Sequence, residues 1–306
     1  MNWTGVMPAM TTAFNPDLSV DHATVARHAQ WLVENGCTCV ICLGSLGEGA
    51  TLSFNEKVDV LKTVIAAVAG KAPVVGTVSS LSTAEAVELA HAAHAVGCSG
   101  LMILPPFVYK GDWRENKAHV AAILKATPLP GMLYNNPVAY GTDFLPEQIG
   151  ELANEHPNLA AVKESSTDVR RVTAIRSLLA DRLAISVGVD DAIVEGVAAG
   201  AVGWVAGLVN AFPRESVDLF NLASEGKTKE AFELYRWFLP LLRMDTVPKF
   251  IQLIKQVQQE AGAGFARVRP PRLELVGEEL AATRAAFEYA QANRPACAVA
   301  STPFKA

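Results

Sequence analysis

The sequence predicts an α/β protein, specifically a (β/α)8 TIM barrel with a C-terminal helical extension. Short apolar runs alternate with longer segments of helical periodicity, in eight units of roughly 25–30 residues each. The 306 residues are 50% hydrophobic and 19% charged, which is enough to bury one large core. Repeated β-then-α units with short loops need parallel strands and right-handed crossovers, and eight of them close into a barrel.

The strands are short apolar runs, and the helices repeat their apolar positions every three or four residues. Two helices open on capping boxes, at 53–56 and 82–85. The predicted strands cover residues 6–12, 39–43, 73–78, 100–104, 131–134, 159–163, 184–187 and 202–205. The predicted helices between them cover 21–35, a stretch from 54, a stretch ending at 96, 113–126, 146–154, 169–179 and 192–199.

This pattern divides the chain into three regions. Residues 1–212 hold the barrel strands and the first seven helices, and residues 213–292 hold the eighth barrel helix and a C-terminal helical region. Residues 293–306 are expected to form a flexible, loosely ordered tail. The competing fold is an open doubly wound sheet, but the glycines in 44–49 have the wrong spacing for the GxGxxG turn that such a sheet often carries.

Charge and composition argue against several classes of partner. The net charge of −5 is unfavourable for binding nucleic acid or an anionic membrane surface. The N-terminus lacks the features of a secretory signal, and the longest apolar run, 196–209, is too short to span a bilayer, so we expect a cytoplasmic protein. Cys37, Cys39 and Cys42 lie along one apolar strand, and we expect all five cysteines to be reduced rather than metal-bound or paired.

Lys163 is the most informative residue of the chain. It ends the apolar strand 159–163, where an unpaired buried ammonium is costly. Such an environment lowers the pKa of a lysine and produces a neutral amine that can attack a carbonyl. The alternative is that the side chain simply extends from the strand end into solvent.

Other strand ends favour the first interpretation, because the C-terminal ends of parallel barrel strands face one mouth. After the second strand, Gly44 and Gly47 flank Ser45, and their backbone N–H groups could form an anion nest. Tyr134 ends the fifth strand and could transfer protons. Together with Lys163 these are the parts of a Schiff-base site for a 2-oxo acid, in which the amine condenses with the ketone and the nest holds the carboxylate.

Further residues are expected at this mouth. The predicted substrate-binding residues follow the second, seventh and eighth strands, and they are Gly44, Ser45, Leu46, Gly188 and Val205. Three more candidates are Glu48, which could position Ser45 or begin the following turn, Tyr109, and Asn136. Asp190 and Asp191 could cap the seventh helix or act directly. We expect neither a metal nor a cofactor.

Three motifs resemble those of the dihydrodipicolinate synthase / N-acetylneuraminate lyase family of class I aldolases, over roughly residues 3–290. Residues 44–48 resemble G-[ST]-x-G-E, residues 134–137 resemble Y-N-x-P, and residues 162–166 resemble the K-[DE]-S segment. The resemblance implies that Lys163 forms the Schiff base, that Tyr134 transfers protons, and that the Ser45 hydroxyl relays to the tyrosine. It also implies a homotetramer made of two dimers.

The chain departs from the family's synthases at positions that matter for substrate. Those enzymes usually continue Y-N-x-P-x-R, where the arginine holds the carboxylate of the second substrate, and Ala139 stands there instead. Phe107 stands near the place of a phenol that usually follows the fourth strand, so Tyr109 supplies that hydroxyl from a shifted position or nothing does. Leu46 replaces a common second threonine. A lysine-pathway synthase is therefore less favoured than a sibling activity.

Segments 134–137, 201–205 and 235–241 look similar to members that act in hydroxyproline breakdown. Those enzymes convert 1-pyrroline-4-hydroxy-2-carboxylate to 2-oxoglutarate semialdehyde and ammonia, and this substrate has a single carboxylate. The alternatives are a pyruvate-dependent aldolase, such as 4-hydroxy-tetrahydrodipicolinate synthase, or a 2-keto-3-deoxy sugar acid aldolase or dehydratase. An alternative of another class is a non-catalytic protein that binds or senses a 2-oxo acid, although binding alone needs no nucleophile.

Overall fold

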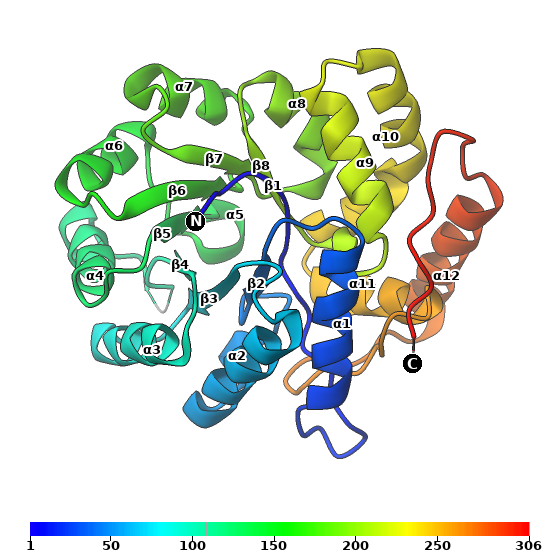
Figure 1. The fold of residues 1–306 in the computed structure, drawn as a ribbon, viewed down its shortest axis with the longest axis horizontal. Helices are drawn as coiled ribbons and strands as arrows, with labels where there is room; N and C mark the ends of the chain where they lie inside the picture. Colours follow the sequence, from blue (N-terminus) through cyan, green and yellow to red (C-terminus); the bar gives the residue numbers. More distant parts are fainter. Residues whose placement is uncertain (108, 306) are drawn as a thin grey trace.

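The computed structural model of the protein describes residues 1–107 and 109–305. Eight parallel strands form a central sheet with helices around it (Figure 1). The strands are hydrogen-bonded in the order β1-β8-β7-β6-β5-β4-β3-β2. They are β1 (Gly5–Pro8), β2 (Val40–Cys42), β3 (Val74–Val78), β4 (Gly100–Ile103), β5 (Gly131–Asn135), β6 (Leu159–Glu164), β7 (Ala184–Val187) and β8 (Gly203–Ala206).

The two ends of this sheet meet, so that it closes into a barrel. Ala9 and Ile41 form a parallel bridge, and the Met10 N–H donates to the Ile41 carbonyl at 2.9 Å. The Thr38 N–H likewise donates to the Val6 carbonyl at 2.9 Å. The predicted (β/α)8 barrel is confirmed, and the open doubly wound sheet is excluded.

The helices around the barrel begin and end close to the predicted positions. Ser53 caps the second of them through both halves of the predicted capping box. The helices that follow the eight strands in order are α1 (His22–Glu34), α2 (Phe54–Val68), α3 (Thr83–Val96), α4 (Trp113–Lys125), α6 (Pro146–Glu155), α7 (Arg170–Leu179), α8 (Ile193–Ala198) and α9 (Pro213–Ser224). A short helix that the sequence analysis did not predict, α5 (Pro137–Tyr140), follows β5.

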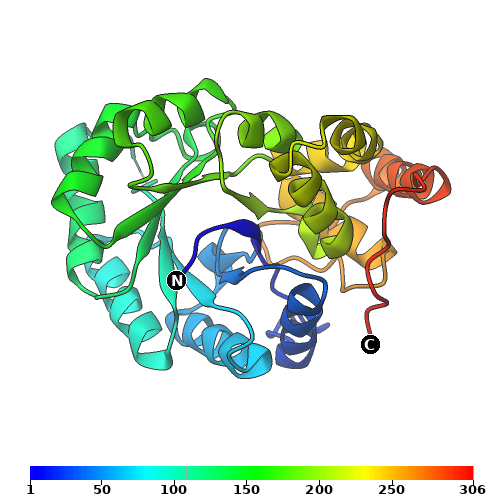
Figure 2. The same ribbon diagram turned by 45° about the horizontal axis from the view of Figure 1, so that its top comes forward.

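The C-terminal region packs on one side of the barrel (Figure 2). It contains α10 (Thr228–Leu242), α11 (Phe250–Glu260) and α12 (Gly277–Ala292). A single hydrophobic core includes residues from Trp3 to Ala290, so the helical extension is continuous with the barrel interior.

The tail after α12, for which composition predicts loose order, contacts α1 in this structure. The Trp31 indole donates to the Thr302 carbonyl at 2.6 Å, and the Thr302 N–H donates to the Asn35 side chain at 2.9 Å. Phe304 packs edge-on against Trp31, with ring centroids 5.6 Å apart. These contacts join residues that are distant in sequence, which is why composition alone did not indicate them.

The five cysteines are all free thiols, as the sequence predicts. Cys37, Cys39, Cys42 and Cys98 are buried, Cys297 is exposed, and none of the five is in a disulfide. Within residues 1–107 and 109–305, no helix combines the length and the apolar character that crossing a membrane requires.

Candidate active site

Lys163 points into a cavity at the C-terminal mouth of the barrel. The side chain is buried, and the residue pairs in register with Tyr134 of β5 and Ser186 of β7. The cavity has a volume of about 460 Å³, which suits a small organic acid. Because Lys163 lines this cavity and does not reach the outer surface, the alternative of a solvent-extended side chain is wrong.

The surroundings of Lys163 favour its neutral form. Burial lowers the pKa of the Lys163 amine, although the Asp245 and Asp190 carboxyls act in the opposite direction. Its Nζ lies 4.1 Å from the centroid of the Tyr134 ring. A glycine at 188 leaves room for this lysine, since a Cβ there would lie 2.6 Å from Lys163 Cε. A neutral amine held in place beside a phenol can attack a carbonyl carbon.

Tyr134 lies beside the lysine with its hydroxyl held by a neighbour. The Asn136 side-chain amide donates to the Tyr134 hydroxyl at 3.0 Å. Burial raises the pKa of Tyr134 to about 12, so the phenol is protonated near neutral pH. Tyr134 is therefore suited to donate a proton. It can accept one only after it has given its own proton to another group.

The resemblance implied that the Ser45 hydroxyl contacts Tyr134. In the structure, its hydrogen bond is with Tyr140 instead. The two tyrosine rings meet edge to face, with centroids 5.9 Å apart. Burial raises the pKa of Tyr140, so this phenol is also protonated. Ser45, Tyr140 and Tyr134 therefore line one wall of the cavity, within the same chain.

Tyr140 was missed by the sequence analysis, although the sequence contains a signal for its position. Asn136 caps α5 by accepting from the Ala139 N–H at 3.0 Å, Pro137 occupies the first turn, and Gly141 ends the helix with a φ of 71°. Asn, Pro and Gly in this order are typical of a short helix. This single turn brings the residue at 140 back over the mouth.

The other candidate for a phenol, Tyr109, lies outside the cavity. Its side chain is 58% exposed, and it is not among the residues that line the cavity. Phe107 packs its ring against Tyr140, with centroids 5.9 Å apart. Tyr140 therefore places a phenol hydroxyl at the cavity, and Tyr109 does not.

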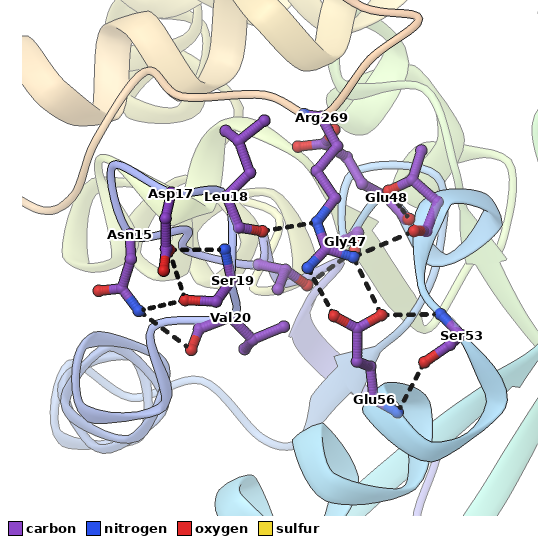
Figure 3. A network of polar contacts seen from close by, with 12 residues as sticks. Asn15, Asp17, Leu18, Ser19, Val20, Gly47, Glu48, Ser53, Glu56 and Arg269 are labelled. Atoms are coloured by element: carbon purple, nitrogen blue, oxygen red, sulfur yellow. Dashed lines mark hydrogen bonds and ion pairs between the residues drawn. The ribbon is translucent and has the colours of Figure 1, made fainter.

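Glu48 anchors the loop after β2 and does not contact the Ser45 hydroxyl. Its N–H closes a turn onto the Ser45 carbonyl at 3.0 Å. Its carboxylate accepts from the buried Lys255 of α11 at 2.8 Å and from the Arg269 N–H at 2.9 Å. The Arg269 guanidinium in turn donates to Glu56 at 2.5 Å and to the Leu18 carbonyl at 2.9 Å (Figure 3). The loop after β2 is thereby tied to the C-terminal region.

Asp190 stabilises the turn after β8. Capping of α8 by Asp190 or Asp191, one of the two predicted roles, is not observed, because α8 begins without a side-chain cap. The Asp190 carboxylate accepts from the Trp204 indole at 2.9 Å, from the Gly207 N–H at 3.1 Å and from the Leu208 N–H at 2.7 Å. Burial raises the pKa of Asp190 to about 6. Asp190 therefore fixes the backbone next to the cavity without lining it.

Two charged residues of the cavity lining come from the C-terminal region and were not predicted. Asp245 belongs to the 3-10 helix Arg243–Thr246, and Arg272 follows α11. Burial raises the pKa of Asp245 well above its ordinary value. Ala139 also lines the cavity. So do all the predicted substrate-binding residues, which are Gly44, Ser45, Leu46, Gly188 and Val205.

A (β/α)8 barrel with a buried lysine at the end of β6, a tyrosine beside it on β5 and a glycine-flanked serine after β2 defines a class of enzyme, the class I lyases that form a Schiff base through lysine. The chain belongs to the dihydrodipicolinate synthetase family, whose model matches residues 2–290. The resemblance noted from the three motifs is confirmed.

Individual relatives agree with this assignment. The 4-hydroxy-tetrahydrodipicolinate synthase of Alkalilimnicola ehrlichii is 31% identical over 291 residues, which cover 94% of this chain and 98% of the relative. The enzyme of the same name from Desulforamulus reducens is 29% identical, over 90% of this chain and 93% of the relative. The solved structure of 4-hydroxy-tetrahydrodipicolinate synthase from Methylacidiphilum fumariolicum SolV superposes with a TM-score of 0.91 at 26% identity, over 97% of this chain and all of that one.

Proposed function

We propose that Lys163 forms a Schiff base with a small 2-oxo or cyclic 2-imino acid, and that the substrate is 1-pyrroline-4-hydroxy-2-carboxylate, converted to 2-oxoglutarate semialdehyde and ammonia. The observation that carries the Schiff base is the buried Lys163 amine beside Tyr134 in a cavity of about 460 Å³. The choice of substrate is supported by Ala139, which lines the cavity at the position where a synthase is expected to hold a second carboxylate.

The chemistry follows from the reactivity of an imine. The Lys163 amine adds to carbon 2 of the ring and the bond to the ring nitrogen breaks, which leaves a protonated imine on the lysine and a free amine on carbon 5. Loss of a proton from carbon 3 gives an enamine, which expels the hydroxyl of carbon 4 as water. Proton shifts along the chain then convert the carbon 5 amine to an imine. Hydrolysis of both imines consumes two waters and releases ammonia, the semialdehyde and the free lysine.

The remaining side chains of the site have roles in binding and proton transfer. The backbone N–H groups after β2 hold the substrate carboxylate, as an anion nest does. Tyr134 donates to and accepts from the substrate, and Ser45 connects with Tyr140 as a second source of protons on the same wall.

The second candidate is 4-hydroxy-tetrahydrodipicolinate synthase, and the names of the relatives support it more directly than they support the deaminase. Arg272, which lines the cavity from the C-terminal region, could take the second carboxylate in place of the missing arginine. A 2-keto-3-deoxy sugar acid aldolase or dehydratase also needs only one carboxylate site. Membership of a family of lyases makes a purely non-catalytic role the least favoured alternative.

One assay with two substrates separates these candidates. Purified protein is given either the hydroxypyrroline, with ammonia and semialdehyde measured, or pyruvate with aspartate semialdehyde, with the condensation product measured. The proposal predicts that kcat/KM is higher for the hydroxypyrroline by about 10²-fold or more, the order expected when a charged bidentate contact is missing. Efficient condensation without ammonia release would favour the synthase instead.

Assembly and location are part of the same proposal. A homotetramer made of two dimers agrees with the common oligomerisation of the family, and light scattering of the purified protein measures it. The cytoplasm agrees with the net charge of −5 and with five cysteines that form no disulfide. Cell fractionation tests this location.

A further inference from the structure

Asp245 is the one acidic side chain of the cavity lining in the described part of the chain. It is held by the 3-10 helix Arg243–Thr246, which follows α10. Its Oδ1 lies directly against Gly207, because a Cβ built at position 207 would come within 2.2 Å of it. The turn after β8 thus has no side chain where the Asp245 carboxyl enters the cavity.

Burial is the main cause that raises the pKa of the Asp245 carboxyl, and the neighbouring acids Asp190 and Asp191 add to it. Asp190 binds the Gly207 N–H at 3.1 Å, so carboxyl groups from two different segments flank the same glycine. Asp191, which follows Asp190 in the chain, has its carboxylate 3.8 Å from the Arg243 guanidinium. Lys163 of β6 lines the same cavity and acts to lower the pKa of Asp245, while burial lowers the pKa of the lysine itself. Among residues 1–107 and 109–305, no ion pair or hydrogen bond engages the Asp245 carboxyl.

A protonated carboxyl that lines a cavity and has no hydrogen-bond partner in the protein can donate to a bound ligand. The proposed substrate brings a hydroxyl that must leave, and hydroxide is a poor leaving group unless it receives a proton. The other proton carriers, Tyr134, Ser45 and Tyr140, come from the β2 and β5 ends, whereas Asp245 lies against the β8 end. The cavity therefore has a further acid, which enters beside a different strand end from the two tyrosines.

We propose that Asp245 is the general acid that protonates the departing hydroxyl on carbon 4 of the substrate, a role that rests on the proposed function. The lone pair of the Lys163 enamine re-forms the C=N bond, the C2=C3 pair shifts to form C3=C4, and the C4–O bond breaks. The Asp245 carboxyl gives its proton to the leaving oxygen, so that water departs and Asp245 remains as a carboxylate. Solvent then returns a proton to Asp245 before the next turnover.

The test compares Asp245→Asn with Asp191→Asn, a neighbouring acid that does not line the cavity. Asparagine keeps the shape of the side chain but cannot give up a proton in this way. With the hydroxypyrroline, kcat of Asp245→Asn should fall by on the order of 10²–10⁴, with a small change in KM. Asp191→Asn should stay within about threefold of the unaltered protein. The decline of kcat at high pH, where Asp245 loses its proton, should disappear in Asp245→Asn.

Two further substrates distinguish an acid from a structural residue. Pyruvate has no hydroxyl to expel, so borohydride trapping of pyruvate should proceed as fast in Asp245→Asn as in the unaltered protein. A 4-chloro analogue of the substrate loses chloride, which needs no proton, so the Asn variant should recover to within about tenfold of normal.

Each outcome decides the matter. Near-normal ammonia release by Asp245→Asn, parallel loss of pyruvate trapping, or equal slowing with the chloro analogue would overturn the role of Asp245 and leave the proposed function standing. No ammonia release by the unaltered protein would overturn both.

Discussion

The buried ion pair between Lys255 and Glu48 links the C-terminal region to the loop after β2, and Lys255→Met tests this link. The two side chains are 1% and 0% exposed, and Nζ lies 2.8 Å from the carboxylate. Removing one member of such a pair typically costs about 3–5 kcal/mol, because the other charge stays buried without its partner. Glu48 keeps the Arg269 N–H at 2.9 Å and has Arg272 at 4.0 Å, so we expect the low end, about 3 kcal/mol.

Urea unfolding measures this loss as a lower midpoint with an unchanged slope. Lys249→Met is the matched control, because its pair with Glu279 is half exposed and should contribute little. The double variant Lys255→Met/Glu48→Gln should recover part of the lost stability, since no buried charge remains. The single variant should also raise KM, because the loop after β2 loses its anchor. A stability loss equal to that of the Lys249 control would refute the importance of this pair.

The remaining predictions concern the reaction. Tyr134→Phe should slow turnover by on the order of 10²–10⁴ with folding unchanged, and near-normal kcat would remove Tyr134 from the mechanism. Tyr140→Phe should reduce kcat while Tyr109→Phe should have no effect, because only the Tyr140 phenol contacts Ser45. A larger loss of kcat in Tyr109→Phe would contradict the geometry. Because burial lowers the pKa of Lys163, the rise of activity with pH should have its midpoint below the ordinary lysine value. Borohydride trapping rates that show no midpoint between about pH 5 and 10 and are still rising at the upper end would contradict this.

The fold was predictable because each barrel unit encodes its own strand and helix through local periodicity. The predicted first strand, 6–12, was too long, since only Gly5–Pro8 pairs as a strand and the Thr11 N–H donates instead to the Asn210 side chain at 3.1 Å. That contact crosses most of the chain, and periodicity carries no information about it. The same holds for the contacts of Thr302 with α1.

The candidate site was predictable where a residue ends a strand, because strand ends of a parallel barrel share one mouth. Lys163, Tyr134 and Ser45 all lie at the cavity for this reason. Asp245 and Arg272 enter from segments beyond the barrel, and local sequence does not indicate which surface those segments cover. The partner of Ser45 was also not predictable from the spacing of the motifs.

The central claim is that Lys163 carries the reaction as an imine, and the most direct measurement is borohydride trapping with the hydroxypyrroline followed by peptide mass spectrometry. The protein should gain the mass of one reduced adduct on the peptide that contains Lys163, and Lys163→Ala should give neither adduct nor ammonia. Lys255 is the other buried lysine whose pKa is lowered by burial, and it serves as the internal comparison. An adduct on Lys255 or on any other lysine, or ammonia release that survives Lys163→Ala, would contradict the account.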